Sequence, residues 1–164
     1  MPEKYPDPAA APTGVPEPAP AVFRSIDHIG IAVHDLDAAI EWYAEKFGMR
    51  VVHIETNADE HVREAMLEVG ESGPLLQLIA PLDEESPVAR FLASRGEGLH
   101  QIAYTVDDVE AATTTLRERG VDTLYERSHA GTWGSRVNFV HPKTAGGVLV
   151  ELVEHPDASS GPSR

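Results

Sequence analysis

Four polar side chains interrupt stretches of the chain that are otherwise apolar: His28, Gln77, Gln101 and Glu151. Each stands among Ile, Leu, Val or Ala, and an unpaired amide or carboxylate is costly to bury, so each needs a partner. An imidazole nitrogen, two amide oxygens and a carboxylate form a plausible ligand set for a divalent metal ion. A single such residue is more often a hydrogen-bonded structural residue. A metal site therefore requires that the fold bring the four together.

An internal repeat would place these four residues around one centre. The segment "DHIGIAV" is echoed 73 positions later by "HQIAYTV", and "LLQLIA" is echoed 74 positions later by "LVELVE". The repeat pairs His28 with Gln101 and Gln77 with Glu151. Internal repeats indicate copies of one structural unit. Two equivalent strands from each copy would then deliver four polar groups to one pseudo-twofold axis.

Each copy is predicted to contain a strand, a helix and three further strands. In the first strand of each copy, large apolar residues recur at every second position. Asp35 or Asp108 follows this strand as the expected N-cap of a helix. The expected strands are 27–33, 50–55, 62–69 and 74–80 in the first copy, and 101–106, 122–126, 136–140 and 147–153 in the second. The pattern is βαβββ used twice, which is an α+β fold.

Small residues beside the polar positions leave room for a ligand. Because side chains alternate along a strand, Gly30 shares a face with His28, and Ala103 shares one with Gln101. A further carboxylate, Glu64, lies on the strand before Gln77 and is predicted to face the same space.

The length of 164 residues suits one domain with a substantial core. Prolines recur through the first 22 residues, so this stretch is predicted to be a disordered tail. The predicted divisions are a tail at 1–22, a folded domain at 23–156 made of modules at about 24–81 and 97–155 joined by a helix at about 86–95, and a second tail at 157–164.

Composition excludes several classes of function. The formal net charge of −14 makes nucleic acid and anionic membrane surfaces poor partners. No apolar stretch approaches the roughly 18 residues of a membrane span, and we do not expect the first residues to act as a secretory signal. The absence of cysteine removes thiolate metal sites and cysteine nucleophiles and fits a cytoplasmic location.

Longer motifs resemble one enzyme family. The segments "DHIGIAV", "EAMLEV", "LLQLIAPLDEESPVARFLASRGEGLHQIAY" and "NFVHPKTAGGVLVELVE" are similar to the methylmalonyl-CoA epimerase family of the vicinal oxygen chelate superfamily. The resemblance implies two pseudo-symmetric modules whose mixed sheet curls around a metal cleft, the vicinal oxygen chelate fold. It also implies a homodimer, a divalent cofactor that is commonly cobalt, and interconversion of (R)- and (S)-methylmalonyl-CoA in propionate metabolism.

The family's site residues fall on particular positions of this sequence. Its metal ligands correspond to His28, Gln77 and Glu151, and its two catalytic carboxylates correspond to Glu64 and Glu151. The remaining ligand is the second His of a "GLHH" motif, where this chain has Gln101. The resemblance implies that both carboxylates move the α-proton, one on each face of a metal-stabilised enolate.

The departure at Gln101 leaves three arrangements open. The neighbouring His100 could bind metal only if the strand bulged or slipped, because one step along a strand turns a side chain to the other face. A site with three ligands is another alternative. We expect the Gln101 amide oxygen to be the fourth ligand. An amide in place of an imidazole should favour Mn²⁺ or Mg²⁺ over Co²⁺, with Ni²⁺ and Zn²⁺ also open.

Other activities of the same fold are alternatives. One is a glyoxalase-like lyase, and another is a metal-free protein that binds a small molecule. A ring-cleaving dioxygenase needs two His and one carboxylate at its metal, and only His28 is well placed. The loop at 126–136, with Trp133, is expected to close over the acyl group. Candidate contacts for the phosphates of coenzyme A are Arg63, Arg136 and Lys143.

Overall fold

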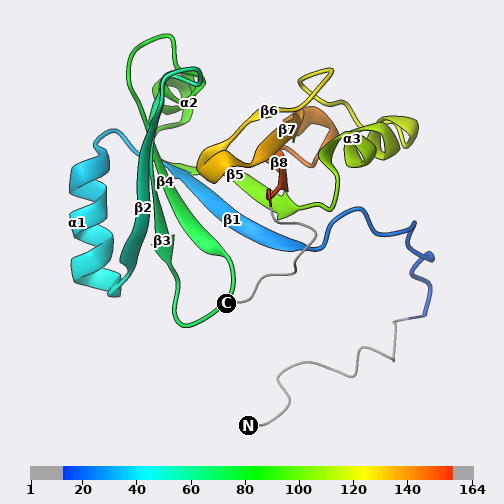
Figure 1. Cartoon of the computed structure of the whole chain (residues 1–164), viewed down its shortest axis with the longest axis horizontal. Coiled ribbons are helices and arrows are strands. Elements are labelled where there is room, and N and C mark those ends of the chain that lie inside the picture. The colour runs from blue at the N-terminus through cyan, green and yellow to red at the C-terminus, as the bar shows by residue number, and fades with distance from the viewer. Residues whose placement is uncertain (1–12, 157–164) are drawn as a thin grey trace, which may run out of the picture.

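The computed structural model describes residues 13–156 (Figure 1). Its elements in chain order are β1 (Ser25–Ala32), α1 (Leu36–Phe47), β2 (Arg50–Asn57), β3 (Val62–Glu68), β4 (Leu75–Pro81), α2 (Pro87–Arg95), β5 (Gly98–Thr105), α3 (Val109–Glu118), β6 (His129–Ala130), β7 (Arg136–Val140) and β8 (Leu149–Glu154). Short 3₁₀ turns lie at Thr132–Gly134 and Pro142–Thr144. The parts of the predicted tails at 1–12 and 157–164 lie outside the described residues.

One curled sheet of eight strands carries the fold, in the order β2-β3-β4-β1-β5-β8-β7-β6. Two βαβββ modules contribute four strands each, and they meet where β1 runs antiparallel to β5. Each of these central strands has a parallel partner from its own module, β4 beside β1 and β8 beside β5. The α+β fold with two pseudo-symmetric modules is confirmed.

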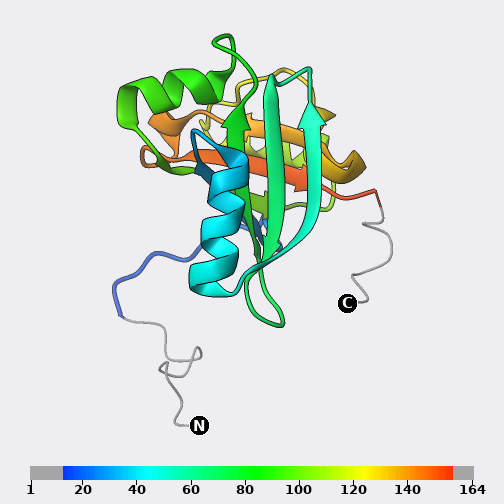
Figure 2. The same ribbon diagram turned by 90° about the vertical axis from the view of Figure 1, so that its left-hand side faces the viewer.

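Helices α1 and α3 cover the outer face of the sheet and leave the inner face to the cleft. Figure 2 shows α1 lying against the strands of the first module, with its axis running along them. Ile40 and Tyr43 of α1 pack against a buried cluster that includes Leu67 and Leu78. Leu116 of α3 packs in the equivalent cluster of the second module.

Both expected helix caps are present. Asp35 accepts a hydrogen bond from the Ala38 backbone N–H at 3.0 Å, and Asp108 accepts one from Ala111 at 2.9 Å. These bonds satisfy N–H groups that would otherwise have no partner at the start of each helix. The helix expected over 86–95 is α2. None of the helices in residues 13–156 is long and apolar enough to cross a membrane.

The strand expected at 122–126 is wrong. This segment makes only one isolated bridge to the sheet, and the strand that pairs with β7 in its place is the two-residue β6. The physical reason is that side chains take the backbone bonds of the segment. Asn138 binds both the N–H and the carbonyl of Tyr125, and Arg117 donates to the carbonyls of Tyr125 and Glu126. A continuous ladder therefore does not form.

Candidate active site

The four predicted metal ligands meet on the central strands. Their side chains are buried, with exposed fractions of 3% for His28 and Gln77, 4% for Gln101 and 7% for Glu151. The strand register brings the side chains together, because Gly30 of β1 lies between Gln77 of β4 and Gln101 of β5. Glu151 of β8 is aligned in the same way beside Ala103.

Glu151 is the centre of a hydrogen-bonded cluster. Its Oε2 atom lies 3.1 Å from His28 Nε2 and accepts a bond of 2.5 Å from the Gln101 amide. The same Gln101 nitrogen donates to Gln77 Oε1 at 3.2 Å. All four predicted ligands therefore belong to one polar network, which has no counterpart in the apolar clusters that surround it.

His28 is held between two carboxylates. Its Nδ1 atom lies 2.8 Å from Asp27 Oδ1, and His155 binds the other oxygen of Asp27 at 2.5 Å. Burial disfavours the imidazolium, but the Glu151 charge and the bonds to both carboxylates outweigh it and raise the pKa of His28 to about 10. Burial of Asp27 is likewise outweighed by its two His partners, which hold its pKa well below the usual range. The Asp27–His28 pair directs Nε2 toward Glu151, as carboxylates do for metal-binding His.

Glu64 joins the cluster from β3. Its exposed fraction is 4%, its Oε2 atom accepts a bond of 2.8 Å from Gln77 Nε2, and its Oε1 atom accepts a bond from the Thr132 hydroxyl. Burial, with further charge repulsion from Glu151, outweighs the Thr132 bond and raises the pKa of Glu64 to about 7. A carboxyl group with a pKa near neutrality suits general acid–base catalysis.

The cluster opens into a cleft that is lined by residues of both modules. This cleft has a volume of about 300 Å³, and Glu64, Gln77, Gln101 and Glu151 all line it. Its remaining wall is largely apolar and includes Ile79, Val88, Val137 and Phe139. A space of this kind, with few convergent polar groups in an apolar wall, is typical of a small-molecule site.

Gly30 allows the two glutamines to pack over β1. A Cβ atom added at this position would lie 2.7 Å from Gln101 Cγ and 3.0 Å from Gln77 Oε1. The first contact is too short for the structure to accept without movement of Gln101. Glycine is therefore required here by the close approach of both side chains, and no left-handed backbone is involved.

We expect Gly30→Ala to reduce turnover because it displaces Gln101, and to lower stability by about 1–3 kcal/mol, the usual range for overpacking. Adding Gln101→Ala should relieve the clash, so the double variant should be more stable than the sum of the single changes. Urea unfolding of the four proteins in this cycle measures the coupling. Additive free energies would show that Gly30 does not constrain Gln101.

The family model that matches the chain covers residues 27–139 and is described as the glyoxalase/bleomycin resistance protein/dioxygenase superfamily. The chain belongs to this superfamily. Within it, the ethylmalonyl-CoA/methylmalonyl-CoA epimerase of Cereibacter sphaeroides is 36% identical over 129 residues, which cover 77% of this chain and 95% of that protein.

Two solved structures of superfamily members are closer in sequence. The methylmalonyl-CoA epimerase from Mycobacterium tuberculosis is 49% identical with a TM-score of 0.81, and the match covers 88% of this chain and 97% of that one. A variant of the Streptomyces coelicolor methylmalonyl-CoA epimerase, in complex with 2-nitronate-propionyl-CoA, is 44% identical with a TM-score of 0.79, over 82% and 99% of the two chains. The resemblance recognised from the sequence motifs is confirmed.

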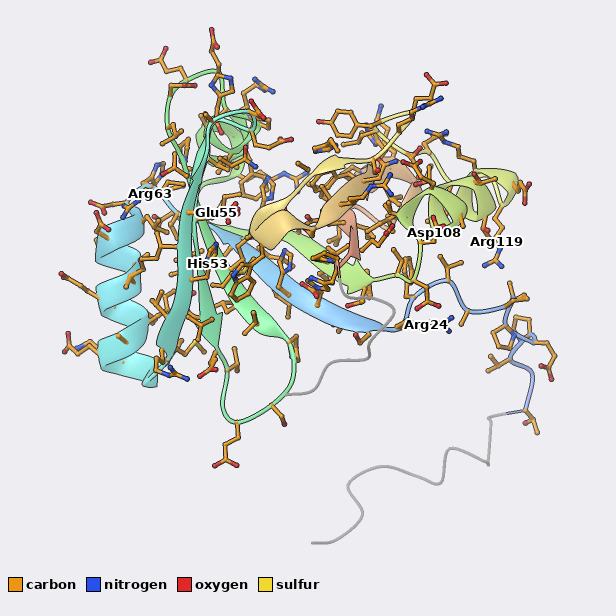
Figure 3. The ribbon with its side chains drawn as sticks, viewed as in Figure 1. Arg24, His53, Glu55, Arg63, Asp108 and Arg119 are labelled. Atoms are coloured by element: carbon orange, nitrogen blue, oxygen red, sulfur yellow. The ribbon has the colours of Figure 1, made fainter. Side chains whose placement is uncertain are left out.

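The loop before β7 forms one side of the cleft. Trp133 has a positive φ of 62° and stacks on His53 with 4.6 Å between the ring centroids. Its backbone N–H donates to Glu55 at 3.3 Å. Figure 3 shows His53 and Glu55 together on β2. The loop thus reaches from the second module to the first and holds Thr132 against Glu64.

Sequence reasoning missed four residues that shape the site. Asp27 and His155 orient His28, Thr132 binds Glu64, and Arg90 lines the cleft. Asp27 is adjacent to a predicted ligand, Thr132 belongs to the loop that was expected to close over the acyl group, and Arg90 belongs to the helix expected at 86–95. His155 had no such signal for its contact, because it reaches Asp27 across 128 positions of the sequence.

None of the three cations expected to contact phosphate lines the cleft beside the polar cluster. Arg63 points toward α1, where it binds Asp37 at 2.9 Å (Figure 3). Arg136 binds Glu110 at 3.0 Å, and Lys143 belongs to the second 3₁₀ turn. Both arginines are therefore already paired with carboxylates, while Arg90 of α2 places a guanidinium group in the cleft wall.

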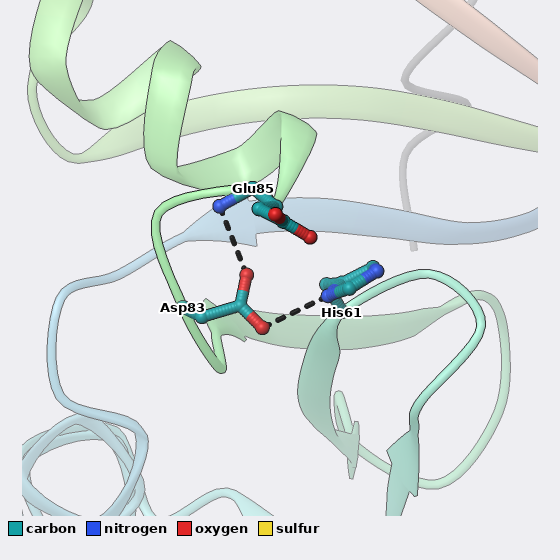
Figure 4. A group of neighbouring side chains, drawn as sticks. All are labelled: His61, Asp83 and Glu85. Carbon is teal, nitrogen blue, oxygen red and sulfur yellow. Dashed lines mark hydrogen bonds and ion pairs between the residues drawn. The ribbon is translucent and has the colours of Figure 1, made fainter.

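A second group of possible ligands lies at the surface. His61, Asp83 and Glu85 bring ligand atoms within 4.8 Å of one another (Figure 4). His61 Nδ1 lies 2.8 Å from Asp83, which also accepts a bond of 2.9 Å from the Glu85 backbone N–H. The Asp83 bond and charge raise the pKa of His61. This ion pair ties the turn between β2 and β3 to the loop after β4, which accounts for the grouping.

Proposed function

We propose that this chain interconverts (R)- and (S)-methylmalonyl-CoA. The observation that carries the proposal is the pair of buried carboxylates, Glu64 from the first module and Glu151 from the second, which face one cleft through the same hydrogen-bonded network. Relatives named as epimerases of this substrate, including one solved with a CoA-thioester analogue, support it.

Epimerisation requires that a proton leave one face of a carbon and return to the other. In the proposed reaction one carboxylate takes the α-proton, and the C–H electron pair moves into the bond toward the thioester carbonyl. The second carboxyl group then donates a proton to the opposite face. Two groups on different modules can lie on opposite sides of the carbon, and each serves as base or acid according to direction.

The chain's own residues prepare this transfer. Thr132 and Gln77 hold the two oxygens of Glu64, and burial keeps its pKa near 7, so it can both lose and gain a proton at neutral pH. The apolar wall of the cleft limits access of water to a carbanion-like intermediate. Glu151 is held by His28 and Gln101.

We also propose a divalent metal cofactor at this cluster. Gln77 Oε1 and Glu151 Oε2 fit such an ion as they stand, and His28 Nε2 fits once it releases the proton that it shares with Glu151, while Gln101 presents its nitrogen. A bound metal would supply Lewis-acid stabilisation of negative charge on the thioester oxygen. Cobalt is the family's common ion, and the amide ligands favour Mn²⁺ or Mg²⁺. The homodimer and the cytoplasmic location remain predictions.

The proposal is tested by proton NMR of methylmalonyl-CoA in D₂O with the purified protein and added Mn²⁺ or Co²⁺. We expect loss of the α-proton signal together with inversion, measured with a stereospecific mutase. Absence of exchange with every metal would refute the epimerase. Turnover of a glutathione hemithioacetal under the same conditions would instead identify a glyoxalase-like lyase.

A further inference from the structure

The Gln101 side chain places a hydrogen-bond donor where a metal ligand was expected. Its Nε2 atom lies 2.5 Å from Glu151 Oε2 and 3.2 Å from Gln77 Oε1. An amide nitrogen is a donor and does not ligate a metal. If the amide turned so that its oxygen and nitrogen exchanged places, Gln101 Oε1 would lie about 2.5 Å from Glu151 Oε2 with no proton between them. Two oxygen atoms in that position repel each other. The carboxylate of Glu151 therefore selects the orientation that is seen.

The other end of the same amide is bound by His100. His100 Nδ1 lies 2.9 Å from Gln101 Oε1, so Nδ1 carries the proton in this arrangement. A neutral imidazole has one donor and one acceptor nitrogen. If its proton moved to Nε2, Nδ1 would accept a bond from the turned amide. His100 can thus hold Gln101 in either orientation, and its ring is fixed edge-on against Phe91 of α2.

Gln77 is oriented so that this exchange frees two ligands at once. Its Nε2 atom donates to Glu64, which leaves its Oε1 atom facing Gln101. The Gln101 nitrogen therefore covers one oxygen of Gln77 and one of Glu151, and both are proposed metal ligands.

We propose that the Gln101 amide nitrogen occupies the place of a cation between Glu151 and Gln77, so that a metal ion binds only after the amide turns and His100 changes the nitrogen that carries its proton. This inference rests on the proposed use of the cluster as a metal site. Gln101 then competes with the metal while its nitrogen faces Glu151, and it becomes a ligand after the amide turns. His100 is a positioning residue, because it holds the Gln101 amide.

Removal of the side chain distinguishes a competitor from an ordinary ligand. Mn²⁺ affinity would be measured by calorimetry in a His61→Ala background, which removes the surface group of His61, Asp83 and Glu85 as a second binding site. We expect Gln101→Ala to bind Mn²⁺ roughly tenfold more tightly than its parent, because a bond to a charged acceptor no longer has to be broken, while water can replace the neutral amide oxygen as a ligand. Equal or weaker binding by Gln101→Ala would overturn the proposal.

A second measurement uses protein in which Gln101 is unchanged. In ¹⁵N NMR of the imidazole rings, His100 Nδ1 should show a protonated, pyrrole-type signal without metal and an unprotonated, pyridine-type signal with the diamagnetic ion Zn²⁺. The signals that vanish in His100→Phe assign the ring. An Nδ1 atom that keeps its proton when Zn²⁺ binds would show that the amide does not turn.

Neither readout uses substrate, so the inference and the proposed function can fail separately. Tighter binding by Gln101→Ala together with no α-proton exchange in D₂O would refute the epimerase and leave the role of Gln101 intact. Normal α-proton exchange together with weaker Mn²⁺ binding by Gln101→Ala would refute the role of Gln101 and leave the proposed epimerase intact.

Discussion

Glu64→Gln should lower epimerisation of methylmalonyl-CoA by roughly 10²–10⁴-fold, the usual contribution of a general acid–base group. The substitution removes the ability to take a proton and changes little else. The new amide oxygen can accept from Gln77, and its nitrogen can donate to the Thr132 hydroxyl, so both partners of Glu64 keep a hydrogen bond. Mn²⁺ affinity should therefore stay within a few-fold of the parent.

The same variant separates exchange from inversion. With Glu151 intact, one epimer should still exchange its α-proton with D₂O, while no proton is delivered to the opposite face. Proton NMR measures the exchange, and a stereospecific mutase measures the inversion. Glu68→Gln is the matched control, because Glu68 lies on the same strand and pairs with Arg50 at the surface. Inversion by Glu64→Gln at the parent rate would exclude the two-base scheme.

The internal repeat is the reason that much of the fold and the cluster could be predicted. Because strand side chains alternate, two aligned strand pairs were enough to place His28, Gln77, Gln101 and Glu151 on one face. The structure brings these four together and adds Glu64 from β3, as expected. Their roles as ligands and acids remain predictions.

The repeat alignment fails at β3 and β7, where the offset between the two modules changes by one residue. The 74-residue offset that pairs Gln77 with Glu151 also sets Asn138 opposite Glu64. Asn138 instead points to α3, where it binds Thr113, while Val137 and Phe139 line the cleft. A one-residue shift along a strand exchanges its two faces. The same difference accounts for the missing strand at 122–126, because Asn138 binds the backbone of Tyr125.

Contacts between distant segments could not be predicted from local pattern. His155 reaches Asp27 from the end of the described chain, and Thr132 reaches Glu64 from the second module. The orientation of the Gln101 amide is of the same kind. It depends on the charge of Glu151 and the ring of His100 together, and neither is visible in the residue types of the strand alone.

Glu151→Gln should impair both proton transfer and metal binding, in contrast to Glu64→Gln. Glu151 carries the one negative charge among the four proposed ligands, and the number of ligand charges sets much of a site's affinity. We expect epimerisation to fall roughly 10²–10⁴-fold and Mn²⁺ affinity to fall at least roughly tenfold. The amide oxygen can still accept the bond from Gln101, so the fold should persist. Thermal unfolding checks this, with Glu68→Gln again as the control.

The two losses after Glu151→Gln can be separated by adding metal. If Glu151 were only a ligand, saturating Mn²⁺ would restore inversion to the parent rate. If it also transfers a proton, inversion remains lost at saturation, while Glu64 still exchanges one epimer with D₂O. Burial disfavours the charged form of His28 and Glu151 opposes that effect, so the variant should also lower the pKa of His28. Unchanged Mn²⁺ affinity would show that Glu151 is not a ligand and would leave proton transfer as its single role.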